Sequence, residues 1–279
     1  MEQINSKQDL INYFEKGCKK ENQLSVGVEH EKFIFDNPTN QRVNFETVSK
    51  IFDFLEQFGW KPIKEKDYVI GLSREGQSIT LEPGNQIELS GAKLNSVHLN
   101  CSESYKYLDE LRKACKKLNL KMMSVSFDPF TKLENVPQTP KQRYEIMTKE
   151  MPKDGKLSLH MMYQTCGTQI NLDYMSEKDF IKKFKLSSFL VPISTAIFAN
   201  SPIVENSLSG YLSYRAKVWQ NTSRAGLPKS FLEDMDFEKY TDFVINMPLL
   251  FVLKNSQYLN AEGKNFKDFM DGKLSILKN

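Results

Sequence analysis

Apolar and polar residues alternate in several short runs along the chain, and this spacing of two predicts β-strands with one buried and one polar face. Such runs cover residues 24–35, 67–73, 77–82, 86–90, 121–127, 161–173 and 249–253. The tripeptide Pro83-Gly84-Asn85 separates two of them. Proline presets the first corner of a turn and glycine adopts positive φ freely, so this tripeptide predicts a hairpin.

Other stretches place apolar residues three or four positions apart, which predicts helices. They cover residues 6–17, 46–58, 96–118, 141–151, 176–199, 211–219 and 236–245. Ser6 with Asp9, and Ser176 with Asp179, have the spacing of N-terminal capping boxes, and Pro192 predicts a kink or a break in the fifth helix. Helices and strands are mixed without strict βαβ alternation, and no linker divides the chain. We therefore expect an α+β fold with a largely antiparallel sheet, in a single catalytic domain of residues 1–279.

Composition narrows the classes of function. Lys and Arg number 38 against 35 Asp and Glu, a net charge of +3 that offers no basic patch for nucleic acid. No apolar run is long enough for a membrane span, and the first twenty residues fit neither a signal nor a transit peptide, so we expect a soluble cytoplasmic protein. The four cysteines and three histidines are scattered, which argues against zinc. Any metal should be a hard cation bound by oxygen.

The polar faces of three predicted strands carry four glutamates. Glu29 and Glu31 share one face of the first strand, while Glu82 and Glu88 lie on the two strands of the hairpin, beside hydroxyl side chains. Mg²⁺ prefers oxygen ligands and is commonly held by a few carboxylates together with substrate phosphates. The alternative is a solvated face of an antiparallel sheet. Such a face usually interleaves both charges, whereas Lys32 is the only cation within two residues of any of the four, and this favours a metal site.

A further polar face lies on the predicted strand 161–173. Thr165, Gln169, Asn171 and Asp173 fall on the same side of that strand. Uncharged hydrogen-bonding side chains of this kind suit the orientation of a small polar substrate. A hydrogen-bonded edge strand explains the same pattern, so the face alone does not decide between the two.

Two arginines are candidates for carboxylate recognition, because a guanidinium can bind a carboxylate through two parallel hydrogen bonds. Arg215 and Trp219 are four residues apart and share a face if this stretch is helical. Arg143 follows two prolines at the start of another predicted helix. Either arginine could instead be an ordinary surface residue. The chain has neither a P-loop nor a GxGxxG motif, so any ATP would be held by another arrangement.

Several of these segments resemble, in order, the motifs of the plant-type glutamate–cysteine ligases, a family that also occurs in proteobacteria. The matching segments read VGVEHEKFIF, GLSREGQSITLEPGNQIELSG, MMYQTCGTQINLD, TAIFANSPIVENSLSGYLSYRAKVW and SRAGLP. The resemblance implies a fold related to the catalytic domain of glutamine synthetase, with a curved sheet forming a funnel. It also implies that ATP phosphorylates the γ-carboxylate of L-glutamate and that the amine of L-cysteine then displaces phosphate, the first step of glutathione synthesis.

The resemblance assigns roles residue by residue, with Mg²⁺ and ATP as the cofactor and co-substrate. The expected Mg²⁺ ligands are Glu29, Glu31, Glu82 and Glu88. The expected glutamate-binding and catalytic arginines are Arg143 and Arg215, and the expected lining of the substrate site is Thr165, Gln169, Asn171, Trp219 and Leu250. The expected nucleotide contacts are Lys32 and Arg224.

Two departures from the family pattern leave alternatives open. Leu250 stands where the family usually has a tyrosine after Pro-Met, so the amine substrate could differ from cysteine. The family also continues past the position matching Asn279, so the chain corresponds to the N-terminal majority of the family's domain. The remaining alternatives are a related carboxylate–amine ligase and an incomplete relative that only binds glutamate or Mg-ATP. The choice between monomer and homodimer stays open.

Overall fold

The computed structural model describes residues 4–222 and 228–277, and its centre is an antiparallel sheet. The strands of this sheet are β1 (Val26–Asp36), β2 (Lys61–Glu65), β3 (Tyr68–Arg74), β4 (Gln77–Leu81), β5 (Ile87–Ser90), β6 (Leu120–Met123) and β7 (Thr168–Leu172). They are ordered β2-β3-β4-β5-β1-β6, and β7 pairs with the first half of β1. Every pairing between these strands is antiparallel.

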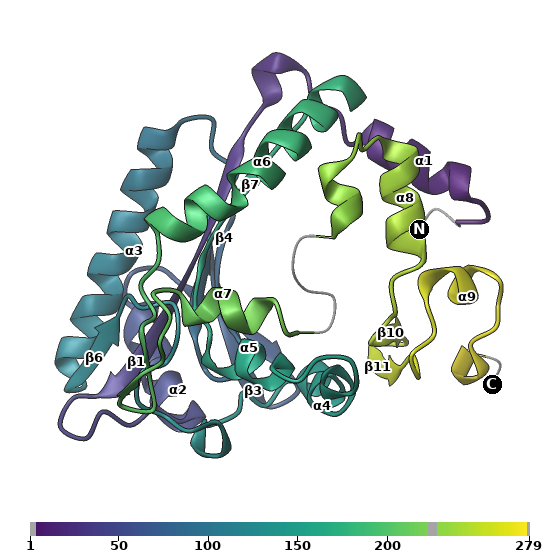
Figure 1. The fold of residues 1–279 in the computed structure, drawn as a ribbon. Helices are drawn as coiled ribbons and strands as arrows, with labels where there is room; N and C mark the ends of the chain where they lie inside the picture. Colours follow the sequence, from purple (N-terminus) through teal and green to yellow (C-terminus); the bar gives the residue numbers. More distant parts are fainter. Residues whose placement is uncertain (1–3, 223–227, 278–279) are drawn as a thin grey trace.

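One face of the sheet is covered by two helices, α2 (Phe45–Glu56) and α3 (Val97–Lys117) (Figure 1). The main core lies between them and the sheet, because alternate strand residues such as Leu72, Ile79 and Leu89 point to this side and are fully buried. The intervening strand positions point the other way, where Glu29, Glu31 and Glu88 are polar, whereas Phe33 and Phe35 further along β1 are buried in a second apolar cluster. The apolar pattern that builds the core therefore also fixes which residues line the opposite face.

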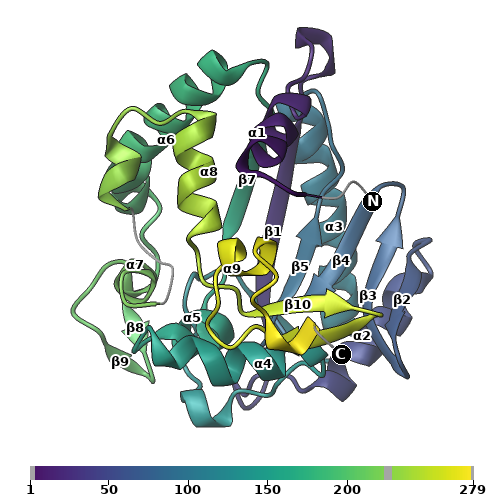
Figure 2. The same ribbon diagram turned by 90° about the vertical axis from the view of Figure 1, so that its right-hand side faces the viewer.

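The opposite face of the sheet is framed by the second half of the chain (Figure 2). Its helices are α4 (Gln142–Glu150), α5 (Ser158–Gln164), α6 (Glu177–Ile197), α7 (Tyr214–Trp219), α8 (Phe237–Ile245) and α9 (Phe266–Met270), together with the N-terminal α1 (Lys7–Lys16). Two small hairpins are formed by β8 (Ile203–Val204) with β9 (Ser207–Leu208), and by β10 (Phe251–Lys254) with β11 (Gln257–Asn260). None of the described helices is both long and apolar enough to cross a membrane.

The mixed α+β class and the antiparallel sheet are confirmed, and both predicted N-terminal caps form. Ser6 and Asp9 make a complete capping box on α1, and the Ser176 side chain accepts from the Asp179 backbone N–H at the start of α6. Helix α6 runs through Pro192 without a break.

One predicted strand is wrong in its first half. Residues 161–173 divide into the end of α5 and the strand β7, which begins at Thr168. Met162 and Tyr163 are buried in an apolar cluster with Val136 and Met151. The alternation in this stretch therefore reflects the packing of a buried helix, which a short apolar run cannot distinguish from a strand.

The predicted hairpin between β4 and β5 is present, but its turn differs from the expected one. The residue with positive φ is Asn85, at +59°, rather than Gly84. Gly84 is required for space, since an added Cβ would lie 2.5 Å from the carbonyl oxygen of Tyr163. A side chain at this position would push the hairpin away from α5.

Candidate active site

Three glutamates meet where β1, β4 and β5 lie side by side. Glu31 and Glu88 are directly opposite each other across β1 and β5. Glu82 follows the last residue of β4 and raises the pKa of both. Glu29 lies one row further along β1, opposite Ser90. The register therefore brings the four predicted site glutamates onto one polar face.

Burial and the repulsion of neighbouring carboxylates disfavour the charged forms of Glu31 and Glu88. Burial raises the pKa of Glu31 to about 8, and the charges of Glu82 and Glu88 contribute in the same direction. Burial also raises the pKa of Glu88, again with Glu82 as a second cause. Carboxylates packed in this way gain stability from any cation that lies among them.

The arrangement is not a complete protein cage for a metal ion. Within residues 4–222 and 228–277, no three His, Cys, Asp or Glu side chains gather closely enough to hold one. Mg²⁺ usually takes only one or two carboxylates and completes its shell with water and substrate phosphates. The crowded pair Glu31 and Glu88, with Glu82 beside it, fits an ion that is shared with a phosphate-bearing substrate.

Arg215 approaches the glutamates from α7. Ser213 caps this short helix by accepting a hydrogen bond from a backbone N–H, and the Arg215 guanidinium lies 5.2 Å from the ring centroid of Trp219, as the spacing of four predicted. The charge of Glu31 opposes the lowering of the Arg215 pKa by burial. The Nε atom of Arg215 is buried without a hydrogen-bond partner in the described part of the chain. Among the described residues, Arg215 Nε thus lacks the hydrogen-bond partner that a buried N–H normally has.

The start of β7 is shaped to admit that guanidinium. The Gly167 carbonyl oxygen accepts a hydrogen bond from the Glu31 backbone N–H at 3.0 Å. A Cβ on Gly167 would lie 2.9 Å from a terminal nitrogen of Arg215. Glycine at this position therefore lets Arg215 reach Glu31.

Arg143 lies at the Glu82 side of the same cluster. Its guanidinium donates to the Tyr144 hydroxyl at 3.1 Å and lies 4.9 Å from the centre of that ring. The Tyr144 hydroxyl is 2.9 Å from the Leu81 carbonyl oxygen and 3.4 Å from Oε1 of Glu82. Burial raises the pKa of Tyr144, so this side chain remains a neutral hydrogen-bonding group. The two arginines thus lie on either side of the carboxylates.

Two residues beside Glu82 are not predicted by the sequence pattern. They are Tyr144 and Lys141. Lys141 is buried, and its ammonium donates to the Leu81 carbonyl oxygen at 2.7 Å. The available signal was their position directly around Arg143, in the segment that follows Pro140. Their contact with the end of β4 is a long-range feature that no local pattern reveals.

A buried polar network holds the turn that carries Glu82. Arg42 forms an ion pair with Asp128 at 2.9 Å and also donates to the Gly84 carbonyl oxygen. Gln86 donates to the carbonyl oxygen of Thr165 at 2.9 Å. These contacts tie the hairpin to the loop before α5 and to the loop after it, so the position of Glu82 relative to Glu88 is fixed by side chains that are remote in sequence.

The polar face of β7 is only partly as expected. Asn171 donates to Glu29 at 3.1 Å, and Gln169 donates to Asn171 at 2.9 Å, so both amides join the carboxylate face. Thr165 does not, because it precedes β7, is buried, and donates its hydroxyl to the Met161 carbonyl oxygen at 2.7 Å. The error follows from the wrong strand assignment in this segment.

Three other expected site residues lie elsewhere or cannot be placed. Lys32 alternates with Glu31 along β1, pairs with Ile87 of the apolar face, and donates to the Glu31 carbonyl oxygen, so its side chain does not reach the carboxylate face. Leu250 packs at the margin of the apolar cluster beneath α4 and α5. Arg224 lies outside the described residues.

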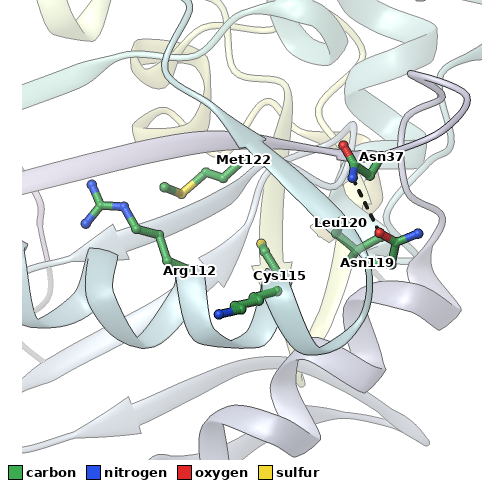
Figure 3. A pocket seen from close by; sticks show the side chains of 7 residues that line it. Asn37, Arg112, Cys115, Asn119, Leu120 and Met122 are labelled. Atoms are coloured by element: carbon green, nitrogen blue, oxygen red, sulfur yellow. Dashed lines mark hydrogen bonds between the residues drawn. The ribbon is translucent and has the colours of Figure 1, made fainter.

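Two surface cavities lie away from this site. One, of about 380 Å³, is lined by residues at the C-terminal end of α3 and the start of β6, including Arg112, Cys115 and Asn119 (Figure 3). The other, of about 580 Å³, lies at the opposite end of the sheet near Cys18 and Asp173. Neither is lined by any of the four glutamates, so the candidate site is the carboxylate face with its flanking arginines.

The chain is similar over almost its whole length to plant proteins named glutamate–cysteine ligase. It is 42% identical over 274 residues to the tobacco protein, and the matched region covers 97% of this chain and 52% of that protein. It is 42% identical over 273 residues to a protein of japonica rice, covering 96% of this chain and 56% of that protein. The Arabidopsis thaliana protein is 39% identical over 276 residues. The chain spans about half the length of the curated relatives it matches.

The same comparison corrects the expected location. The tobacco, rice and Arabidopsis proteins are all named chloroplastic, which contradicts the cytoplasmic location expected from composition. Targeting segments are removed from mature proteins, so the composition of a folded region does not record its compartment.

The family comparison gives the same result as the individual relatives. The model of glutamate-cysteine ligase family 2 matches residues 25–272. This range includes β1, the β4–β5 hairpin and α7, the elements that carry the glutamates and Arg215. The chain therefore belongs to glutamate-cysteine ligase family 2.

Proposed function

We propose that this chain carries out, or forms the catalytic part of an enzyme that carries out, the ATP-dependent joining of L-glutamate to L-cysteine. The product is γ-glutamylcysteine, and the released products are ADP and phosphate. The observation that carries the proposal is the cluster of Glu31, Glu82 and Glu88 between two arginines, Arg143 and Arg215, in a member of this family. Residues 1–279 would act as one catalytic domain with a glutamine-synthetase-like fold, in which the sheet forms a funnel.

The arginines fit the recognition of glutamate. A guanidinium binds carboxylates and phosphates through paired hydrogen bonds. Arg215 has a buried donor without a partner among the described residues and reaches the carboxylate face beside Glu31. We place the reacting end of glutamate next to Arg215. Its guanidinium would then oppose the negative charge of the phosphorylated γ-carboxyl, and Arg143 would do so from the Glu82 side.

The glutamates fit the binding of Mg²⁺ together with the ATP phosphates. Glu29, Glu31, Glu82 and Glu88 would together hold two or more ions, each bound by one or two carboxylates and by ATP phosphates. The ions would neutralise charge on the transferring phosphoryl group. Asn171 and Gln169 would keep Glu29 oriented through the hydrogen bonds described above. The γ-carboxylate oxygen attacks the terminal phosphorus of ATP and ADP leaves. The cysteine nitrogen then attacks the γ-carbonyl carbon, phosphate leaves, and the nitrogen loses a proton.

A product assay on the purified 279-residue chain tests this function. The reaction contains Mg²⁺, ATP, glutamate and cysteine, and mass spectrometry follows γ-glutamylcysteine and ADP. We expect both products in equal amounts. Formation of neither product would contradict the proposal and leave a chain that at most binds its substrates.

The same assay decides between amine substrates. ADP that forms with glutamate but without the cysteine dipeptide would point to a different amine acceptor. The residue to examine would then be Leu250, which packs against the apolar cluster of α4 and α5 and offers no hydroxyl to a substrate. A screen of small amines with Leu250→Tyr as the matched variant would identify the acceptor.

A further inference from the structure

Lys141 is a buried cation at the edge of the carboxylate face. Its side chain is only 5% exposed. The ammonium lies 5.4 Å from the ring centre of Tyr144 and donates to the Leu81 carbonyl oxygen at 2.7 Å. Leu81 is the last residue of β4, and Glu82 follows it directly. Lys141 is therefore hydrogen-bonded to the end of β4, directly before Glu82.

Residues around Lys141 also bind the same turn, through hydrogen bonds from uncharged groups. The hydroxyl of Thr139 donates to the Glu82 carbonyl oxygen at 2.5 Å, and the backbone N–H of Thr139 donates to the Pro83 carbonyl oxygen at 2.9 Å. The Tyr144 hydroxyl is bonded to the same Leu81 oxygen as Lys141. The turn would therefore retain several hydrogen bonds if Lys141 were an apolar residue, and its anchoring alone does not explain a buried ammonium.

Carboxylates near the Lys141 ammonium offset part of the cost of burying its positive charge. Burying an ammonium is costly unless opposite charges offset the lost hydration. Burial lowers the pKa of Lys141 to about 8, and Arg143 acts in the same direction, while Glu82, Glu65 and Glu88 act against them. Two of these three carboxylates belong to the candidate site. The buried charge of Lys141 thus faces the excess negative charge of the sheet.

We propose that Lys141 is a positioning residue for Glu82: its ammonium fixes the end of β4 and attracts the Glu82 carboxylate into the orientation in which it contributes to nucleotide binding. The proposal rests on the proposed function for the identity of the ligand. Lys141 acts through Glu82, because its ammonium is buried and already bonded to a backbone carbonyl.

The test uses Lys141→Met, which keeps the length of the side chain and removes the charge. The first measurement is a double-mutant cycle with Glu82→Gln on the free energy of unfolding. Coupling predicts that Lys141→Met destabilises the wild type more than it destabilises the Glu82→Gln variant. Equal effects in both backgrounds would overturn the proposal. Lys149→Met, at an exposed position of α4, is the control for the loss of a lysine.

The second measurement is ligand binding by calorimetry, with Mg²⁺ and the non-hydrolysable analogue β,γ-imido-ATP as one ligand and L-glutamate as the other. We expect Lys141→Met to weaken binding of the nucleotide analogue about tenfold and to leave glutamate binding within about twofold. A purely structural role predicts parallel losses for both ligands, and that result would overturn the proposal. Tyr144→Phe removes the other side-chain donor to Leu81 without removing a charge, and it should weaken nucleotide binding less than Lys141→Met does.

These measurements separate the proposal from the function on which it rests. If the wild-type chain binds no nucleotide analogue, the proposed function fails. The unfolding cycle then decides by itself whether Lys141 positions Glu82. If the wild type binds the analogue and Lys141→Met binds it equally well, the proposed function stands and the role of Lys141 is refuted.

Discussion

At the residue scale, burial and neighbouring carboxylates disfavour the ionised forms of Glu31 and Glu88. Glu31 and Glu88 are paired across two strands, and Glu82 raises the pKa of both. Like charges that are held together in this way cost stability unless a cation joins them. Residues of this kind are kept for binding rather than for folding, so their removal should affect ligands more than the fold.

Glu88→Gln tests this at a single residue. The variant keeps the shape and removes one charge of the opposed pair, so the free energy of unfolding should stay the same or rise slightly. Product formation should be lost, and the increase in melting temperature caused by Mg-ATP should disappear. Thermal unfolding with and without Mg-ATP measures both effects. Glu75→Gln, in the exposed turn between β3 and β4, is the control. Turnover at the wild-type rate in Glu88→Gln would remove Glu88 from the site.

The cysteines give a second prediction at this scale, with a defined dependence on pH. Burial raises the pKa of Cys115 to about 11 from an ordinary value of 9.0. Because the folded state favours the protonated thiol, the resulting stability is complete below about pH 9 and is lost as the pH rises through about 11. The advantage of the wild type over Cys115→Ala in unfolding free energy should therefore shrink between these values. A constant difference would contradict this.

Thiol labelling supplies the matching control. Cys101 is exposed, whereas Cys115 and Cys166 are buried. A thiol reagent at neutral pH should therefore label Cys101 rapidly and label the other two only after unfolding.

At the scale of elements, the site depends on close approach between α7 and the loop before β7. Glycine at position 167 leaves room for Arg215, and the backbone of Gly167 is hydrogen-bonded to β1. The turn between β4 and β5 depends in the same way on Gly84, and on the buried pair of Arg42 and Asp128. In both places a small residue and a long cation set the distance between two elements.

Gly167→Ala tests the first contact. An added Cβ would lie 2.9 Å from a terminal nitrogen of Arg215, so the guanidinium should be displaced while the backbone stays in place. We expect glutamate binding to weaken about tenfold, with little change in melting temperature. Gly27→Ala, in the adjacent strand β1, is the control, because a Cβ there comes no closer than 3.8 Å to its neighbours. Equal losses in the two variants would show that the effect is not specific to Arg215.

At the scale of the whole molecule, one helix, α6, leaves a stripe of apolar side chains exposed to solvent. Leu186, Phe189, Leu190, Ile193 and Ile197 follow one another on one stripe of α6, and each is at least 40% exposed. Large contiguous apolar patches on a protein surface promote association. We therefore expect the exposed stripe of α6 to promote self-association.

The replacement of Ile193 and Ile197 by lysine tests this property. The double variant should show less self-association than the wild type in light scattering as the protein concentration increases, because the stripe then carries two charges. Glu75→Lys, in the exposed turn between β3 and β4, changes the net charge by the same amount as the double variant but leaves the apolar stripe of α6 intact, so it should have a smaller effect. If both proteins scatter light as the wild type does, the stripe does not drive association.

The features that depend on local spacing can be predicted from the amino-acid sequence. The period of two placed Glu29 and Glu31 on one polar face, and the spacing of four brought Arg215 over Trp219. These relations follow from the geometry of a strand and of a helix, whatever the rest of the chain does. The α+β class followed from the same patterns, and the family motifs supplied the expected chemistry.

Which of these faces meet depends on the tertiary structure. The pairing of Glu31 with Glu88 and the approach of Lys141 to Glu82 depend on strand register and on contacts between distant segments, which local periodicity does not encode. The same limit explains the two misplaced residues. Local alternation predicts a strand at Thr165, whereas a buried helix ends just before this residue. The pleat of β1 turns Lys32 away from Glu31 and from the face on which a nucleotide contact is expected. Local spacing sets the direction of a side chain, and long-range packing sets its neighbours.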